Sequence, residues 1–342
     1  MRNTSTASPR IKAGSVIVPI SPSSTFIGNT DRGIEINYDG ARAILSQLDG
    51  STSIEDVARS SQVPVEVVAR LVEYLDENNL IDDENTTVYL PGRYKEQDQS
   101  GDAGFIQFHN RARGELAVTT WRDGVRDGGV KLLEERQRYG VEIFGENRIA
   151  TALYGILLAS GITQTYFSRT SRRERPRVDD CDLEATYLRG ADIGEGFHNR
   201  LTDLSRELSL FPLSTDGLSD EAPINFVKVF IGKVDSEQIA QAMSDGDAHI
   251  CISVPDGQSL DIGPLVIPGQ SACHRCVKLA RSDQFPTSSA IDLYRSAQTP
   301  LEIPVSTSHL IAGYIASELI NFFETGTSPL IAHRAHFSYL TP

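Results

Sequence analysis

One stretch in the middle of the chain restricts the fold most, because it has the pattern of a strand, a tight turn, a helix and a second strand. Residues 141–144 form an apolar run typical of a buried strand, and residues 145–148 are turn-forming. Residues 149–160 predict a helix that Gly161 ends, and residues 162–167 predict the next strand. Two strands joined by a helix lie parallel, so we expect a parallel sheet.

The same alternation continues towards the C-terminus and sets the fold class. We predict an α/β fold over residues 105–342, with a doubly wound sheet of the Rossmann type and helices on both of its faces. The further elements that we expect there are strands at 226–231, 249–254 and 335–339 and helices at 236–244 and 308–323.

The first 90 residues have a different pattern, with three short strands followed by three helices. The strands are predicted at 16–18, 26–27 and 33–36. Apolar residues at helical spacing then predict three short helices, the last of which begins near Pro64. This order predicts an α+β winged-helix domain at 1–90, and the polar residues 91–104 predict a linker.

The charge balance limits what such a winged helix would bind, since DNA is the usual ligand of this fold. The chain carries 32 Lys and Arg against 46 Asp and Glu, a net charge of −14, and its first 90 residues are acidic as well. Phosphate binding requires the opposite sign, so we expect no nucleic acid partner, and this balance is the weak point of the alternative hypothesis of a winged-helix transcription factor with an α/β sensor domain. The open alternatives are a packing or dimerisation module and the capture of an extended peptide as an added strand.

Membrane insertion and secretion are not expected either. The longest apolar run, residues 312–323, is interrupted by polar residues and is too short to span a bilayer. The first ten residues lack an apolar signal core, and 4 cysteines do not make a disulfide framework. We therefore expect a cytoplasmic protein.

The turn after the first central strand is where a Rossmann-like fold would hold a phosphate, at the N-terminus of the following helix. Gly145 fits that role, but Asn147 stands where a glycine would let the backbone approach a nucleotide, and Arg148 follows it. The second strand ends in residues 166–169 without the acidic residue that would bind a ribose. We interpret Gly145, Asn147 and Arg148 as a degenerate nucleotide loop, and the alternative is a purely structural use of the fold.

Cys273 and Cys276 have the spacing of one half of a zinc site. A structural zinc ion needs four ligands, and no second pair of this kind occurs in the sequence. A zinc site at Cys273 and Cys276 is possible, but the sequence alone does not supply its complete set of ligands. The alternatives are two reduced thiols or a catalytic thiol whose pKa Arg275 and Lys278 would lower.

The segment around these cysteines resembles a known family. Residues 263–269, Gly-Pro-Leu-Val-Ile-Pro-Gly, followed by the Cys-His-Arg-Cys of 273–276, look like the signature of ThiF-like proteins from azole-forming peptide biosynthesis. Residues 188–194 resemble the Ala-Asp-Val-Gly segment of the same proteins. In that family a winged helix that binds leader peptides, called the RiPP recognition element (RiPP: ribosomally made, modified peptide), precedes the ThiF-like domain, as here.

The resemblance implies a partner role rather than adenylation. Adenylating relatives keep a glycine-rich loop, an acidic residue after the second strand and a lysine, where this chain has Gly145-Glu146-Asn147, Ser168-Arg169 and Phe197-His198. It therefore implies no ATP and no catalytic residue. The chain would present a precursor peptide to a separate YcaO-type cyclodehydratase that makes thiazolines or oxazolines, for a thiopeptide or linear azole product. It also implies a homodimer, and the alternative is a divergent adenylating enzyme that acts on a peptide.

A leader peptide bound as an added strand would lie beside residues 32–38, with the third helix as the opposite wall. Arg32 and Arg70 are the cations expected to meet an acidic leader, and core packing is the alternative role of Leu71. The residues expected to line this site are Arg32, Gly33, Ile34, Glu35, Ile36, Tyr38, Val67, Arg70, Leu71 and Tyr74.

Overall fold

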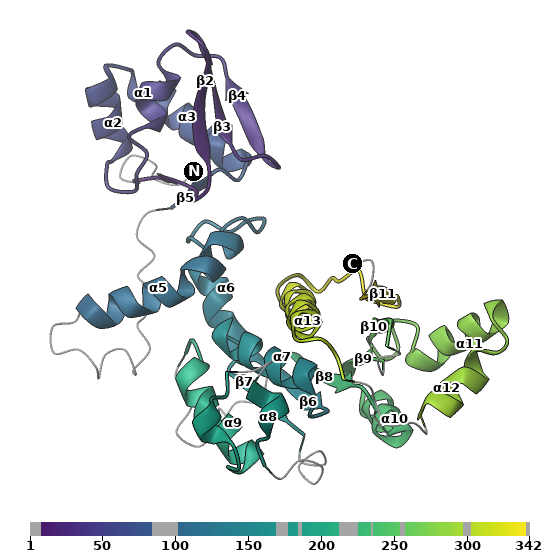
Figure 1. Cartoon of the computed structure of the whole chain (residues 1–342). Coiled ribbons are helices and arrows are strands. Elements are labelled where there is room, and N and C mark those ends of the chain that lie inside the picture. The colour runs from purple at the N-terminus through teal and green to yellow at the C-terminus, as the bar shows by residue number, and fades with distance from the viewer. Residues whose placement is uncertain are drawn as a thin grey trace. The chain divides into compact units, whose positions relative to one another are not determined.

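The computed structural model describes residues 8–83, 102–168, 177–183, 187–211, 225–233, 235–253, 257–296 and 302–339. The chain divides into two compact units, Met1–Glu135 and Arg136–Pro342 (Figure 1). The division falls later than the expected boundary at residue 105, because the segment that follows α5 (Asp102–Thr119) packs in the N-terminal unit, where Trp121 lies against the core. Of the predicted linker, residues 91–101 lie outside the described residues, and residues 102–104 begin α5.

The N-terminal unit contains a three-stranded antiparallel sheet of order β2-β3-β4 and a short antiparallel pair of β1 and β5. Strands β2 to β4 precede three helices along the chain, as the sequence predicts. The elements of this unit besides α5 are β1 (Arg10–Ile11), β2 (Val16–Ser21), β3 (Ser24–Gly28), β4 (Gly33–Ile36), α1 (Ala41–Leu45), α2 (Ile54–Ser61), α3 (Val65–Glu77), β5 (Ile81–Asp82) and α6 (Val130–Glu135).

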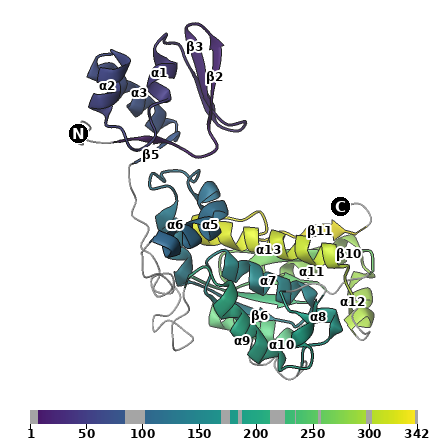
Figure 2. The ribbon, with the colours of Figure 1, turned by 60° about the vertical axis from the view of Figure 1, so that its left-hand side comes forward.

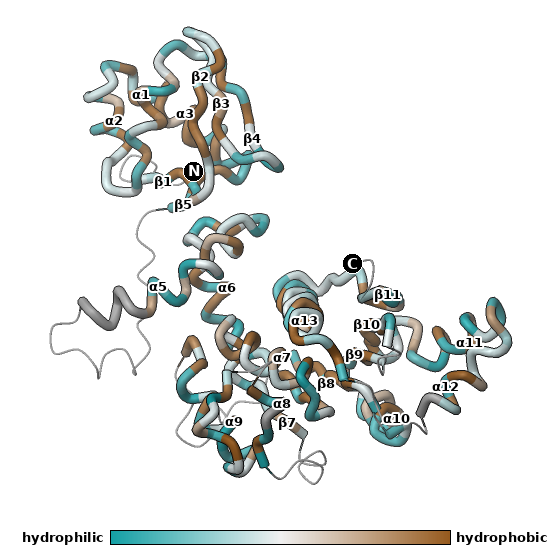
Figure 3. The backbone as a smooth tube through the Cα atoms, viewed as in Figure 1, coloured by the Kyte–Doolittle hydropathy of each residue, from teal (hydrophilic) through white to brown (hydrophobic). Residues whose placement is uncertain are grey.

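The core of the N-terminal unit lies between the three-stranded sheet and the helices. Ile27 of β3, Ile44 of α1 and Leu75 of α3 are fully buried in one cluster. Hydrophobic residues also run along β2, as Figure 3 shows, and Val16, Val18 and Ile20 of that strand stay exposed. The sheet therefore has one covered face, and three apolar side chains of β2 remain in contact with solvent.

The C-terminal unit contains a mixed six-stranded sheet of order β11-β10-β9-β8-β6-β7. Strands β7, β6, β8 and β9 are parallel, so the predicted strand–helix–strand unit and parallel core are confirmed. Strands β10 and β11 run antiparallel to their neighbours, which makes the sheet mixed rather than parallel throughout. The strands are β6 (Tyr139–Phe144), β7 (Gln164–Phe167), β8 (Asn225–Ile231), β9 (Ala248–Ile252), β10 (Ser259–Val266) and β11 (Ala335–Ser338).

Helices cover both faces of this sheet. The larger core lies on one face, where α7, α9 and α13 contribute buried side chains, and α13 packs along α7 (Figure 2). On the other face, Ala242 of α10 packs on Phe144, Phe230 and Cys251. The helices of this unit are η2 (Arg136–Arg138), α7 (Arg148–Ala159), α8 (Asp180–Leu183), η4 (Gly190–Asp192), α9 (Phe197–Leu208), α10 (Ser236–Asp245), α11 (His274–Gln284), α12 (Ser288–Ser296) and α13 (Val305–Thr325).

None of the helices in the described ranges combines the length with the apolar character that crossing a bilayer requires.

Candidate functional site

The three-stranded sheet of the N-terminal unit has two edges, and they differ in their capacity to accept another strand. β3 is the central strand, so β2 and β4 each have one side without a partner strand among the described residues. β2 contains Pro19, which has no backbone N–H and blunts that edge. β4 contains no proline between Gly33 and Ile36. The edge of β4 is therefore the better acceptor for an added peptide strand.

The outer face of α3 presents the side chains predicted for a peptide groove. Val67 and Tyr74 are 36% and 44% exposed, and Arg70 between them is exposed as well. The spacing of these three positions places them on one face of the helix. Arg70 has no ion pair or hydrogen bond within the described part of the chain, so its guanidinium is available to a ligand.

Three of the predicted lining residues pack inward. Leu71 is only 9% exposed and Ile36 7%, and both belong to the core of the unit, which favours the packing role for Leu71. Ile34 is half-buried against the same core. At the ends of β4, Gly33 and Tyr38 are exposed.

Two charged residues near β4 already have partners in the N-terminal unit. The Arg32 guanidinium lies 2.9 Å from the Asp123 carboxylate, in the turn before β4. Glu35 is exposed, and its carboxylate accepts a hydrogen bond from the Ser24 hydroxyl. A leader that used Arg32 would have to compete with Asp123, so Arg70 is the more available cation.

The degenerate nucleotide loop lies at the carboxyl ends of β6 and β8, where the sheet changes winding direction. α7 follows β6 on one face and α10 follows β8 on the other, so a crevice of the kind that binds ligands in α/β proteins is expected between these strand ends. Gly145 has φ +125°, and a Cβ there would lie 2.6 Å from the Ile231 carbonyl oxygen. Position 145 therefore requires a glycine, because the backbone of β8 lies too close to leave room for a Cβ atom.

Asn147 and Arg148 of this loop are engaged in holding the protein itself. The Asn147 side chain accepts the N–H of Ala150 at 3.1 Å and so caps α7. Arg148 donates to the carbonyl oxygen of Ile303 at 3.1 Å and lies 3.7 Å from the Glu302 carboxylate. The Ala150 N–H and the Arg148 guanidinium, which a phosphate would need, therefore already have partners within the protein.

A hydrogen-bonded pair occupies the neighbouring position of the same loop. The Glu146 carboxylate is buried and lies 2.8 Å from Nε2 of His198, at the start of α9. This is the histidine that stands where the resemblance implies a lysine. A carboxylate at the start of α7 disfavours a triphosphate, because the two charges repel each other.

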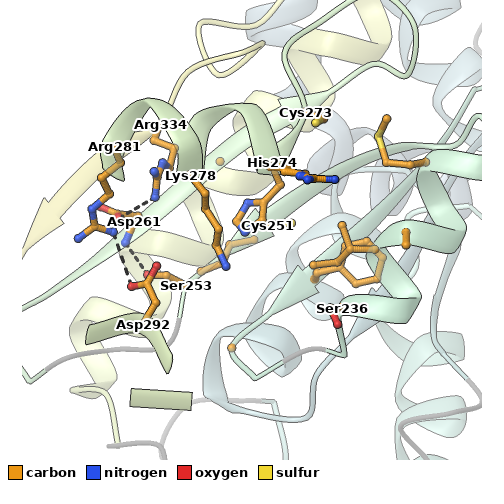
Figure 4. Close-up of a pocket in the computed structure, with 18 of the residues that line it drawn as sticks. Ser236, Cys251, Ser253, Asp261, Cys273, His274, Lys278, Arg281, Asp292 and Arg334 are labelled. Atoms are coloured by element: carbon orange, nitrogen blue, oxygen red, sulfur yellow. Dashed lines mark hydrogen bonds and ion pairs between the residues drawn. The ribbon is translucent and has the colours of Figure 1, made fainter. Parts of the chain in front are cut away.

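A cavity that the sequence did not predict lies over β8, β9 and β10, on the sheet face that carries α10 (Figure 4). Its volume is about 620 Å³. Phe230, Cys251 and Ile252 come from the strands, and α10, α11 and α12 contribute the other walls. Burial raises the pKa of the Cys251 thiol to about 12, so this cysteine is a packing residue rather than a nucleophile.

The predicted zinc half-site lies at the rim of this cavity. Cys273 precedes α11 as its N-cap, and its Sγ lies 3.5 Å from Sγ of Cys276. Hydrogen bonds from the Cys276 backbone lower the pKa of the Cys273 thiol. Among the described residues, no group of three or more histidine, cysteine or acidic side chains is arranged to hold a metal ion. The two thiols therefore do not make a four-ligand zinc site with any described residue.

Histidine and charged side chains complete the cavity wall. Burial lowers the pKa of His274 to about 4, so this imidazole is neutral near pH 7. Asp261 of β10 lies 3.3 Å from Arg334 and 3.8 Å from Arg281, and Asp292 of α12 lies 3.9 Å from Arg281. These residues are far apart in the sequence, so spacing could not have predicted their cluster. The only local signal was the cation-rich stretch from Arg275 to Arg281.

Comparison with solved structures shows the fold over nearly the whole chain. The crystal structure of E. coli MccB with AMPCPP and selenomethionine-labelled MccA matches with a TM-score of 0.62 and 15% identity, over 96% of this chain and 93% of that chain. The Microcin C7 biosynthetic enzyme MccB in complex with N-formylated MccA matches with the same values. The heterocyclase TruD matches with a TM-score of 0.56 and 14% identity, over 98% of this chain and 40% of that chain.

Other comparisons found no relatives. No family model matches the sequence, and no curated protein matches it. The structural likeness at 14–15% identity thus supports the α/β fold with its mixed sheet.

Proposed function

We propose that this chain binds the leader segment of a ribosomally made precursor peptide and presents the core of that peptide to a separate YcaO-type cyclodehydratase. The observation that carries the proposal is that one small unit contains two suitable features. They are an edge strand without proline, β4, and the exposed α3 face of Val67, Arg70 and Tyr74. An extended peptide can add to such an edge through main-chain hydrogen bonds, while pockets along the helix select its side chains.

The two similar structures support a role in peptide modification. MccB is described as a microcin biosynthetic enzyme in complex with MccA, and TruD as a heterocyclase. This chain spans 40% of the length of TruD, so a heterocyclase built with it would need a further protein to supply the remainder. A YcaO-type ATP-dependent enzyme is the partner that we propose, and we propose that the chain works as a homodimer.

Presentation of the core peptide would act through effective concentration. A leader held on the N-terminal unit makes the encounter between core and enzyme intramolecular, at roughly millimolar effective concentration for a short flexible linker. A bound leader therefore accelerates heterocycle formation without any catalytic group in this chain. Arg70 would meet an acidic residue of the leader, and Val67 and Tyr74 would meet apolar ones.

We also propose that the chain does not adenylate a peptide. The start of α7 is capped by Asn147, Arg148 is engaged with Ile303, and Glu146 adds negative charge beside His198. Adenylation builds up charge on phosphates that cations or a metal must stabilise. ATP–pyrophosphate exchange by the purified chain would instead support the alternative of a divergent adenylating enzyme.

The test is a fluorescence-polarisation titration of labelled leader peptides encoded near this gene. We expect submicromolar binding to the full chain, and binding at least tenfold weaker, about 1.4 kcal/mol, for the double variant Arg70→Glu with Tyr74→Ala. Arg59→Glu is the matched control, because Arg59 is an exposed arginine on the neighbouring helix α2. It should bind the leader as the wild type does.

Each other outcome is informative. Tight binding that the double variant leaves unchanged would keep the leader-binding role and exclude the groove between β4 and α3. Absence of binding to every leader, in a sample that circular dichroism shows to be folded, would overturn the proposed function.

A further inference from the structure

The cavity over β8, β9 and β10 has no role in the proposed leader binding, because it lies wholly in the C-terminal unit. It begins at the carboxyl ends of β8 and β9, where Gly232 and Ser253 line it, and continues between α10 and α11. Its volume of about 620 Å³ falls within the usual range for small-molecule sites. The position and size are those of a binding pocket rather than a packing defect.

The charge of the cavity lining is opposite in sign to the net charge of the chain. The chain has a net charge of −14, yet the lining contains five lysine or arginine residues and two aspartates. The aspartates, Asp261 and Asp292, neutralise the cluster at one end through Arg281 and Arg334. The lining residues therefore carry a surplus of positive charge, which favours an anionic ligand.

Lys278 is the cation best placed for that ligand. Figure 4 shows its side chain extending from α11 into the cavity, between the Asp261 cluster and His274. Its ammonium is close enough to act electrostatically on both Cys251 and His274. Lys278 has no ion pair or hydrogen bond in the part of the chain that the structure describes.

A second polar group in the cavity also lacks a partner. Nδ1 of His274 is buried and has no hydrogen bond within the described residues. A buried nitrogen without a partner costs free energy, unless a ligand or a water molecule supplies the missing hydrogen bond. Lys278 and the neutral imidazole of His274 thus line the same cavity.

Apolar side chains also line the cavity. Phe230 and Cys251 form the floor, and Ile239 and Met243 form the wall that α10 contributes. An inorganic anion alone would leave these side chains without contact. A ligand that joins an apolar body to one anionic group would match the apolar side and the Lys278 side together.

We propose that this cavity binds an organic carboxylate with an apolar body, its carboxylate on Lys278 and its body against Phe230, Ile239 and Met243. The carboxylate can come from a free small acid or from the C-terminus of an apolar peptide. Both sources share the chemistry that the cavity recognises. This site is independent of leader binding, so the proposal stands whether or not the leader binds β4.

The test is isothermal titration calorimetry of the full chain with octanoate. We expect one molecule bound per chain and no binding of octylamine, which has the same apolar body with the opposite charge. Lys278→Met keeps much of the aliphatic stem and removes the charge, so octanoate should bind at least tenfold more weakly. Lys131→Met, an exposed lysine of α6, is the matched control and should bind octanoate as the wild type does.

A second variant tests the apolar half of the site. Ala240→Trp fills the cavity from α10 and should abolish octanoate binding, while thermal unfolding shows that the variant is folded. A tripeptide acid, Leu-Phe-Gly, and its C-terminal amide distinguish the two sources. If the tripeptide acid binds more tightly than octanoate and the amide does not bind, the site is assigned to a peptide C-terminus. If octanoate binds more tightly than the tripeptide acid, the site is assigned to a small acid.

Three results would overturn the proposal. They are absence of octanoate binding to the folded wild type, equal binding by Lys278→Met, and equal binding of octylamine.

Discussion

His249 shows how burial of one titratable side chain makes the C-terminal unit sensitive to pH. The residue lies in β9 with its side chain inside the protein, and its Nδ1 lies 2.9 Å from the Asp247 carbonyl oxygen. Burial lowers the pKa of His249 below the ordinary 6.5. The unfolded chain therefore binds a proton at this residue below about pH 6.5, while the folded chain resists it.

Stability must consequently fall as the pH drops below about 6.5, because protonation favours the unfolded state. His249→Asn should flatten this pH dependence of the melting temperature, measured by calorimetry between pH 7.5 and pH 5. The control is His309→Asn, a change at an exposed position of α13, which should keep the wild-type slope. A slope that His249→Asn leaves unchanged would mean that other groups cause the acid sensitivity.

Single residues also show where sequence patterns reach their limit. Asn147 could be recognised as a departure from a glycine-rich loop, but its use as the cap of α7 required the backbone geometry. Arg32 was predicted as a leader contact because of its charge and position. Its partner, Asp123, is 91 positions further along the chain, and no pattern around Arg32 indicates that contact.

At the scale of elements, the sequence predicts those helices and strands whose formation depends on neighbouring residues. The strand–turn–helix–strand unit of β6, α7 and β7 was predictable, because helix periodicity and the Gly145 turn are encoded within about 30 residues. β10 was not predicted, because Gly263 and Pro264 interrupt its apolar pattern and proline is uncommon inside strands. The structure accommodates them with a register shift between Ile262 and Leu265 against β9.

Lys12 joins several elements of the N-terminal unit at one buried point. Its ammonium donates to Oδ1 of Asn79 at 2.5 Å and to the carbonyl oxygens of Thr120 and Val125 at 2.6 and 2.7 Å. The Asp82 carboxylate of β5 lies 3.8 Å away. Burial lowers the pKa of Lys12 and raises that of Asp82, so each charge depends on the contacts around it.

Lys12→Met should destabilise the N-terminal unit by about 3 kcal/mol, because it leaves two buried carbonyl oxygens without their donor and removes the cation that lies 3.8 Å from the Asp82 carboxylate. Trp121 is the single tryptophan of the chain and lies in this unit, so its fluorescence during urea unfolding reports the loss. Lys131→Met should cost less than about 0.5 kcal/mol, as expected at an exposed site. A loss below about 1 kcal/mol for Lys12→Met would show that water replaces the lysine at low cost.

At the scale of the whole molecule, each unit has its own core and its own candidate site. Ile27 and Leu75 belong to the core of the N-terminal unit, whereas Val141 and Leu319 belong to that of the C-terminal unit. The proposed leader site on β4 and α3 lies entirely in the first unit, and the cavity around Lys278 lies entirely in the second. Sites without shared residues are expected to contribute independent free energies.

This separation predicts additivity. Arg70→Glu with Tyr74→Ala should leave the dissociation constant for octanoate unchanged, and Lys278→Met should leave that for the leader unchanged. The variant that combines all three substitutions should show the sum of the separate free-energy effects within about 0.5 kcal/mol, in paired titrations of both ligands. A coupling above about 1 kcal/mol would show that occupancy of the cavity changes leader binding, which would make the cavity ligand a regulator of peptide presentation.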